Sequence, residues 1–251
     1  MSEQKRTIQI DDVDVVDTAP TADTIVERRH DPGSRLERFK RSLTDAAGST
    51  IRIIGFASLL LPFLVTSFLL LDIPVRAFDR FFSDPTIAPG RWFSLGDALL
   101  IIPAMVCVFI ARRSGGDDAA RAVTVAWAAA AMAALVGVIY LAPELQAGDL
   151  PSARFSAVFV FSWMVGQYTT IGLYDVLRGG SSWWRAPLYS LMAGYLVGSA
   201  LLFPLFYFGS NAPWMAWLTI DFAIKAGASF LFLGGYWLLM SRVRPATGYG
   251  R

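Results

Sequence analysis

An aspartate and a lysine, Asp221 and Lys225, lie inside the last long apolar segment of the chain, residues 213–240. This segment exceeds the roughly 20 residues that a helix needs to cross a bilayer, and each charge near its middle costs on the order of 2.5–3.5 kcal/mol to insert. A spacing of four residues places both side chains on one helical face, with the acid N-terminal to the base, so that they can pair. Two interpretations are open: a structural ion pair that faces a neighbouring helix, or a ligand or ion site at the membrane midplane.

Other residues that could do chemistry are scarce. The chain has one cysteine, Cys107, and one histidine, His30, which excludes a disulfide framework, a cysteine metal cluster and histidine-based catalysis. The sequence also lacks paired carboxylates at catalytic spacing and a phosphate-binding glycine loop, because the glycines at 115–116 with the aspartates at 117–118 are typical of a solvated turn. We therefore expect no enzyme, no cofactor, no metal site and no nucleic-acid partner.

Apolar helices must position the charged pair. The chain has 251 residues, of which 55% are hydrophobic, and its mean hydropathy is +0.48. We predict an all-α membrane protein with six transmembrane helices in a domain of residues 51–241. The six spans are expected at residues 51–71, 95–111, 122–142, 154–176, 187–208 and 213–240. In the fifth span, Gly194 and Gly198 form a G-x-x-x-G pattern, which favours close helix packing.

The N-terminal region has a different composition. Residues 1–33 are rich in acids and poor in large apolar side chains, so we predict a disordered tail. In residues 34–49, Leu36, Phe39 and Leu43 recur at helical spacing among basic residues. This pattern predicts a short basic amphipathic juxtamembrane helix. That helix either lies on an anionic leaflet of the lipid bilayer or is simply solvated.

Basic residues predict the orientation in the membrane. The two ends of the chain and the connections on the N-terminal side carry thirteen lysines and arginines near the spans, whereas the opposite connections carry four, Arg76, Arg80, Arg91 and Arg154. The positive-inside rule therefore places both termini in the cytoplasm, including a C-terminal tail of residues 242–251. We expect a multi-pass protein of the bacterial inner (cytoplasmic) membrane.

The C-terminal third carries a set of residues that resembles a known family. The set comprises Gln167, the helix end 173–178 (LYDVLR), the run 183–188 (WWRAPL) with Ser190, and then Gly209, Pro213, Trp214, Trp217, Asp221 and Lys225. Together these residues resemble the VUT, or queuosine precursor transporter, family, especially its alphaproteobacterial members. A looser similarity to the same family covers Pro103 and the turn at residues 112–121.

This resemblance implies an uptake transporter. Members of the family have six spans, are related to the substrate-binding subunits of energy-coupling-factor vitamin transporters, and take up queuosine precursors, which are deazaguanine bases. Many members work without a dedicated ATPase subunit. The resemblance implies a small, planar, polar heterocycle bound between helices, with Gln167 and Asp221 bonded to its edges. Lys225 would then hold Asp221 ionised, and Thr169 or Thr170 would add a weaker contact. A stacking face would come from Trp217, Phe222 or Tyr168.

At three places in the sequence, this chain lacks polar residues of that family. An aspartate one turn from Gln167 is replaced by Thr170, a carboxylate of the fifth span falls near Gly198, and an Asp and an Asn before Arg112 are replaced by apolar residues. Loss of one buried hydrogen-bonding partner commonly costs about 1–3 kcal/mol. If those groups bind the base, we expect this chain to bind it weakly or to bind something else. The alternative is a non-transporting scaffold or assembly subunit that reuses the fold and recruits a membrane protein through its N-terminal tail or a helix surface.

Overall fold

The computed structural model describes residues 32–141, 143–144 and 152–245, with side chains from residue 37 onward. Within these residues the chain is all-α, as the sequence predicts. The long helices are α1 (Pro32–Leu69), α2 (Leu95–Ser114), α3 (Gly116–Leu141), α4 (Ala153–Leu177), α5 (Arg185–Tyr207) and α6 (Trp214–Leu239). Two short 3-10 helices, η2 (Arg76–Phe81) and η3 (Pro89–Arg91), lie in the connection between α1 and α2.

Five of these helices are long and apolar enough to cross a membrane, which confirms that the chain is a multi-pass membrane protein by length and composition. They are α1 from Glu37 onward, α2, α3, α5 and α6. The helix that falls short is α4, although its 25 residues are long enough to span a bilayer. Its second half contains the polar run of residues 167–170, which lowers its hydropathy.

Helix α1 differs from the two elements that the sequence predicted there. We expected one helix at residues 34–49 and a separate span from residue 51, but α1 runs without interruption from Pro32 to Leu69. After Pro32 at its first position, α1 contains no proline before Pro62. The hydroxyl of Thr50 donates to the carbonyl of Ala46 at 2.9 Å, which satisfies a polar side chain within the helix.

The described residues divide into two units, one that ends at Asp45 and one that begins at Ala46. In the first unit, the described residues are helical, and Phe39 and Leu43 are exposed. Residues 1–31 of the predicted tail and residues 246–251 of the C-terminal tail lie outside the described residues, so disorder of residues 1–31 stays a prediction. At residues 32–33 the predicted disorder is wrong, because α1 begins at Pro32.

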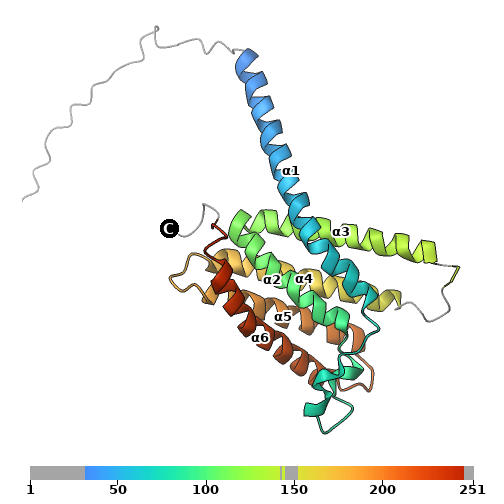
Figure 1. Cartoon of the computed structure of the whole chain (residues 1–251). Helices are drawn as coiled ribbons and strands as arrows, with labels where there is room; N and C mark the ends of the chain where they lie inside the picture. The colour runs from blue at the N-terminus through green and yellow to red at the C-terminus, as the bar shows by residue number, and fades with distance from the viewer. Residues whose placement is uncertain (1–31, 142, 145–151, 246–251) are drawn as a thin grey trace, which may run out of the picture. The chain divides into compact units, whose positions relative to one another are not determined.

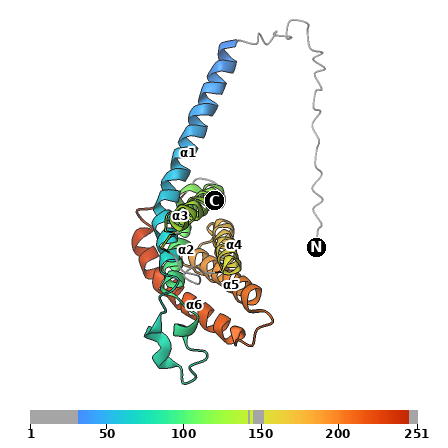
Figure 2. The ribbon, with the colours of Figure 1, turned by 90° about the vertical axis from the view of Figure 1, so that its right-hand side faces the viewer.

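Helix α2 is the centre of the second unit, because it contacts α3, α4, α5 and α6. Its residues Leu100, Cys107 and Val108 are fully buried. The most extensive packing joins α4 to α5 and α5 to α6, and both views show α4 and α5 side by side (Figures 1 and 2). In lipid, such packing relies on close van der Waals fit and interhelical hydrogen bonds more than on the hydrophobic effect.

Small residues bring α4 and α5 together. A methyl group on Gly166 would lie 2.8 Å from the carbonyl oxygen of Gly194, and a methyl group on Gly194 would overlap the hydroxyl of Thr170. A methyl group on Gly198 would lie 3.4 Å from the carbonyl oxygen of Ser162. The close packing expected from the G-x-x-x-G pattern is therefore confirmed, and it fixes the register of the two helices that carry most of the candidate site.

Local signals set the helix ends next to the site. The hydroxyl of Ser94 caps α2 by accepting the backbone N–H of Asp97 at 3.1 Å. At the other end of α2, Gly115 has a φ of +93°, which a glycine adopts without a Cβ clash, and it allows α3 to begin at the next residue. Asp97 is thereby held at the first turn of the central helix.

Candidate functional site

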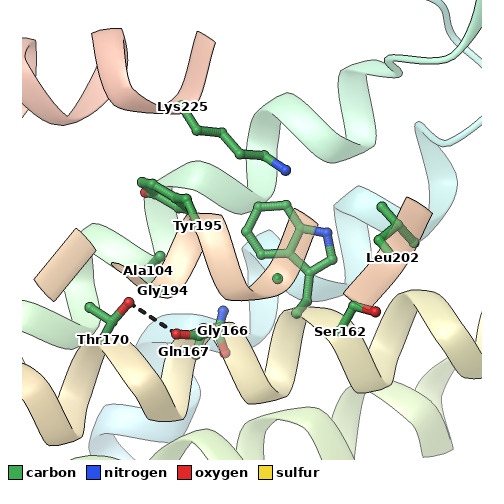
Figure 3. A pocket seen from close by; sticks show the side chains of 11 residues that line it. Ala104, Ser162, Gly166, Gln167, Thr170, Gly194, Tyr195, Leu202 and Lys225 are labelled. Atoms are coloured by element: carbon green, nitrogen blue, oxygen red, sulfur yellow. Dashed lines mark hydrogen bonds between the residues drawn. The ribbon is translucent and has the colours of Figure 1, made fainter. Parts of the chain in front are cut away.

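A small buried cavity lies between α2, α4, α5 and α6. Three predicted site residues, Gln167, Thr170 and Lys225, line it. Its other lining residues are Ala104, Ser162, Trp163, Gly166, Gly194, Tyr195, Gly198 and Leu202. Gln167 and Thr170 reach it from α4, and Lys225 reaches it from the opposite side (Figure 3). Four helices thus bring distant parts of the sequence to one place.

Two buried polar atoms at this cavity have no hydrogen-bond partner in the described part of the chain. They are the hydroxyl of Ser162 and the amide nitrogen Nε2 of Gln167, and both residues are 1% exposed. The amide oxygen of Gln167, by contrast, accepts the indole N–H of Trp127 at 2.8 Å. That bond fixes the amide so that its nitrogen is the free end. A buried polar group without a hydrogen-bond partner is rare and destabilising, so the site favours binding of a polar ligand that supplies the missing partner.

The cavity is small in this arrangement. The space that the centre of a water molecule can occupy is about 10 Å³. This is about the minimum that one water molecule requires, whereas pockets for drug-sized ligands measure roughly 300–1,000 Å³. A planar heterocycle therefore enters only if the helices around the cavity separate.

Thr170 contributes to helix packing at this cavity. Its hydroxyl donates to the carbonyl oxygen of Gly166 at 3.0 Å, one turn earlier on α4, and lies against Gly194 of α5. The threonine that stands where the resembling family has an aspartate is therefore satisfied without a ligand. This contact also closes the cavity on the side of α5.

The predicted ion pair forms inside the bundle. The ammonium of Lys225 lies 2.7 Å from Oδ2 of Asp221, and the two side chains are 3% and 2% exposed. The hydroxyl of Ser199 on α5 donates to the same carboxylate oxygen. The ammonium also lies 4.5 Å from the ring centroid of Trp163, which is a cation–π contact. Lys225 thus connects the cavity to Asp221, which is not itself among the lining residues.

Sequence reasoning missed a second carboxylate at the site. Asp97 is 6% exposed, and its Oδ1 accepts the indole N–H of Trp163 at 3.2 Å. Its carboxyl is also close enough to interact electrostatically with Lys225 and Asp221. The one available signal was the Ser-x-x-Asp pattern at the start of an apolar run, but that pattern indicates only a helix cap. No sequence rule predicted that Trp163 would link Asp97 to Lys225.

Trp217, which the resemblance made a stacking residue, lies outside this cavity. Its indole N–H donates to the carbonyl oxygen of Thr86 at 3.0 Å, and its ring stacks on Trp92 with centroids 6.3 Å apart. It therefore joins the start of α6 to the connection between α1 and α2. In the same connection, the backbone N–H and the hydroxyl of Thr86 lower the pKa of the Asp84 carboxyl.

Several residues that carry the resemblance hold helix ends together at the far end of the bundle. Arg112 donates to the carbonyl oxygens of Val243 and Met240 at 2.9 and 3.3 Å and to the hydroxyl of Tyr236 at 3.1 Å. It thereby satisfies carbonyls that the end of α6 leaves without partners. On α4, Asp175 accepts the first backbone N–H of α3 at 3.1 Å. These contacts give Arg112 and Asp175, which belongs to the LYDVLR segment, a structural role.

No group of three or more His, Cys, Asp or Glu residues that could hold a metal ion occurs among the described residues. Comparisons with known proteins add no assignment. A scan against models of protein families gave no match, and neither the curated proteins nor the solved structures that were searched gave one.

Proposed function

We propose that this chain is an uptake transporter, or the substrate-binding membrane subunit of one, for a small polar heterocycle of the queuosine-precursor type. One observation carries the proposal: the unpartnered amide nitrogen of Gln167 and the unpartnered hydroxyl of Ser162 both line a cavity at the centre of the bundle, beside Lys225. Polar groups inside a membrane domain are costly and usually functional. The resemblance of the C-terminal third to queuosine precursor transporters supports the same ligand class.

The proposal includes six spans with both termini in the cytoplasm of a bacterium. Helix α4 has the length to cross the membrane, and two residues of its polar run, Gln167 and Thr170, are 1% and 0% exposed. A helix whose polar side chains face protein can cross lipid despite a lower hydropathy. The excess of basic residues on one side supports the orientation.

In this proposal the described arrangement is the closed one. Opening requires α5 to move away from α4, which separates Gly194 from Thr170 and widens the cavity from a water-sized space. The heterocycle then accepts a hydrogen bond from Gln167 and stacks on Trp163, the aromatic ring that Lys225 covers in the closed state. Motions of this kind between packed helices are a common route to a closed binding site.

The test is import of a deazaguanine base in a bacterial host that cannot make queuosine precursors. The readout is queuosine in tRNA, with an intact member of the resembling family as the positive control. We expect modification with the wild-type chain and a large loss with Gln167→Leu. Thr169→Ala is the matched control, because Thr169 lies two residues further along α4 and bonds only the carbonyl of Val165. No rescue by the wild-type chain, with normal rescue by the family member, contradicts the proposal.

The second candidate is a membrane scaffold or assembly subunit that keeps the fold without transport. The observation that favours it is the water-sized cavity, closed by the contact between Thr170 and Gly194. This candidate predicts a stoichiometric membrane-protein partner in a gentle detergent pull-down, lost when residues 1–31 are deleted. A small ligand that copurifies with the chain in the absence of such a partner argues against it.

A further inference from the structure

Three ionisable side chains meet around Trp163 in the core of the bundle, and their charges do not balance. Two are carboxylates, Asp97 and Asp221, and one is the ammonium of Lys225. Asp97 comes from α2 and the other two from α6, while Trp163 belongs to α4. With every group in its usual ionised form, this cluster would hold one negative charge in excess.

The only base of this cluster, Lys225, is already paired with one of the two acids, Asp221. Lys225 forms an ion pair with Asp221 at 2.7 Å, and Ser199 donates to the same oxygen. No ion pair joins Asp97 to a cation among the described residues; its partner is the neutral indole N–H of Trp163. A buried carboxylate without a paired cation is far less stable than its neutral acid, so such groups take up a proton.

The other groups that face Asp97 do not change this balance. From α5, Tyr207 lies close enough to interact with the Asp97 carboxyl, but a phenol is neutral near pH 7. From α4, Trp163 donates its neutral indole N–H, and from α6, Lys225 and Asp221 interact with the Asp97 carboxyl. The capping hydroxyl of Ser94 accepts the backbone N–H of Asp97. One bound proton would thus neutralise the excess negative charge of the cluster.

We infer that Asp97, Asp221 and Lys225 form a proton-binding site that holds one exchangeable proton, carried by Asp97 in the closed arrangement. The proton comes from water and returns to water, with no change in oxidation state. When the helices separate and water reaches Asp97, the acid ionises; when they close again, it takes up a proton. A second part of the inference rests on the proposed function: this cycle couples the uptake of one heterocycle to the movement of one proton.

Infrared spectroscopy of the full-length protein in lipid tests the proton directly. A protonated carboxylic acid gives a carbonyl stretch that is separate from the carboxylate bands and shifts in D2O. Exposed acids are ionised near pH 7 and do not contribute. We expect a band equivalent to one acid in the wild-type protein, and the same band in the control variant Ser162→Ala, which changes a neighbouring residue of the cavity without changing charge.

Charge balance predicts how the band changes in three variants. Asp97→Asn removes it. Asp221→Asn also removes it, although Asp97 remains, because Lys225 then neutralises Asp97. Lys225→Met doubles it, because two acids remain without a base. A wild-type protein without the band, or an Asp221→Asn variant that keeps it, overturns the inference. If Lys225→Met does not accumulate as folded protein, the two aspartate variants decide the question alone.

Uptake into proteoliposomes tests the coupling separately, with a radiolabelled deazaguanine base as the probe. A gradient of one pH unit, acidic outside, should raise wild-type accumulation by about tenfold, and a protonophore should abolish the increase. Asp97→Asn should show no response to the gradient. Uptake that ignores the gradient overturns the coupling. Absence of uptake under every condition, with the infrared band present, removes the proposed function and the coupling but leaves the proton site standing.

Discussion

Replacing Gly194 with alanine tests the contact that closes the cavity. The added methyl group would lie 3.1 Å from Cβ of Thr170 and closer still to the Thr170 hydroxyl and the carbonyl oxygen of Gly166. The carbonyl belongs to the backbone of α4 and cannot rotate away, so the two helices must separate. Overpacking of this kind typically costs about 1–3 kcal/mol. Alanine also favours the helical state over glycine by up to about 1 kcal/mol, which offsets part of that cost.

A matched control separates the two effects. Gly172→Ala, on α4, gains the same helix propensity, but nothing lies within 4 Å of its added methyl group. The two variants should therefore differ in the free energy of unfolding by about 1–3 kcal/mol. For a chain of this size, each kcal/mol shifts the midpoint of thermal unfolding by about 2–4 °C. We expect Gly194→Ala to unfold about 2–12 °C below Gly172→Ala.

The single cysteine provides the assay. Cys107 is fully buried in α2, so a thiol-reactive fluorophore labels it only when the bundle opens. A temperature ramp in mild detergent then gives one midpoint for each variant. In the Gly194→Ala background, Thr170→Ala should recover part of the loss, because the clash with the Gly166 carbonyl remains. Equal midpoints for Gly194→Ala and Gly172→Ala would refute the reasoning.

Three further predictions concern the site and the helix ends. Trp127→Phe removes the indole N–H that Gln167 accepts and leaves a buried amide oxygen unpaired, so unfolding by the same thiol assay should become easier by about 1–3 kcal/mol; an unchanged midpoint would contradict this role. Lys225→Met should lose about 3–5 kcal/mol, and adding Asp221→Asn should restore most of it, whereas additive losses would rule out a paired interaction. Arg112→Ala should speed hydrogen exchange at the end of α6 with little change elsewhere, and a uniform change would show that the contact is not local.

The sequence alone determined the class of protein and its helices. The apolar runs are local features, so they predicted an all-α membrane protein, and helices α2, α4, α5 and α6 begin and end within three residues of the expected spans. Helix α3 begins at Gly116, six residues before its expected start, so the turn predicted around residues 115–118 is wrong from Gly116 onward, because Asp117 and Asp118 lie in the first turn of α3. The spacing of Asp221 and Lys225 predicted their pairing, and the two glycines of α5 predicted close packing. All of these are relations within one helix, and helical periodicity fixes them.

Only the tertiary structure decided which of these residues form a site. Asp97 and Trp163 belong to the charged cluster, whereas Trp217 lies outside it. The register and rotation of α2, α4 and α6 relative to one another determine which side chains come into contact. The uninterrupted α1 also departs from the predicted boundary near residue 50, since no residue there forces a break. The size of the cavity depends on contacts between α4 and α5, which lie so close together at Gly166 and Gly194 that an added methyl group would clash. Such distances arise from packing between segments far apart in the chain, and no periodicity along the chain encodes them.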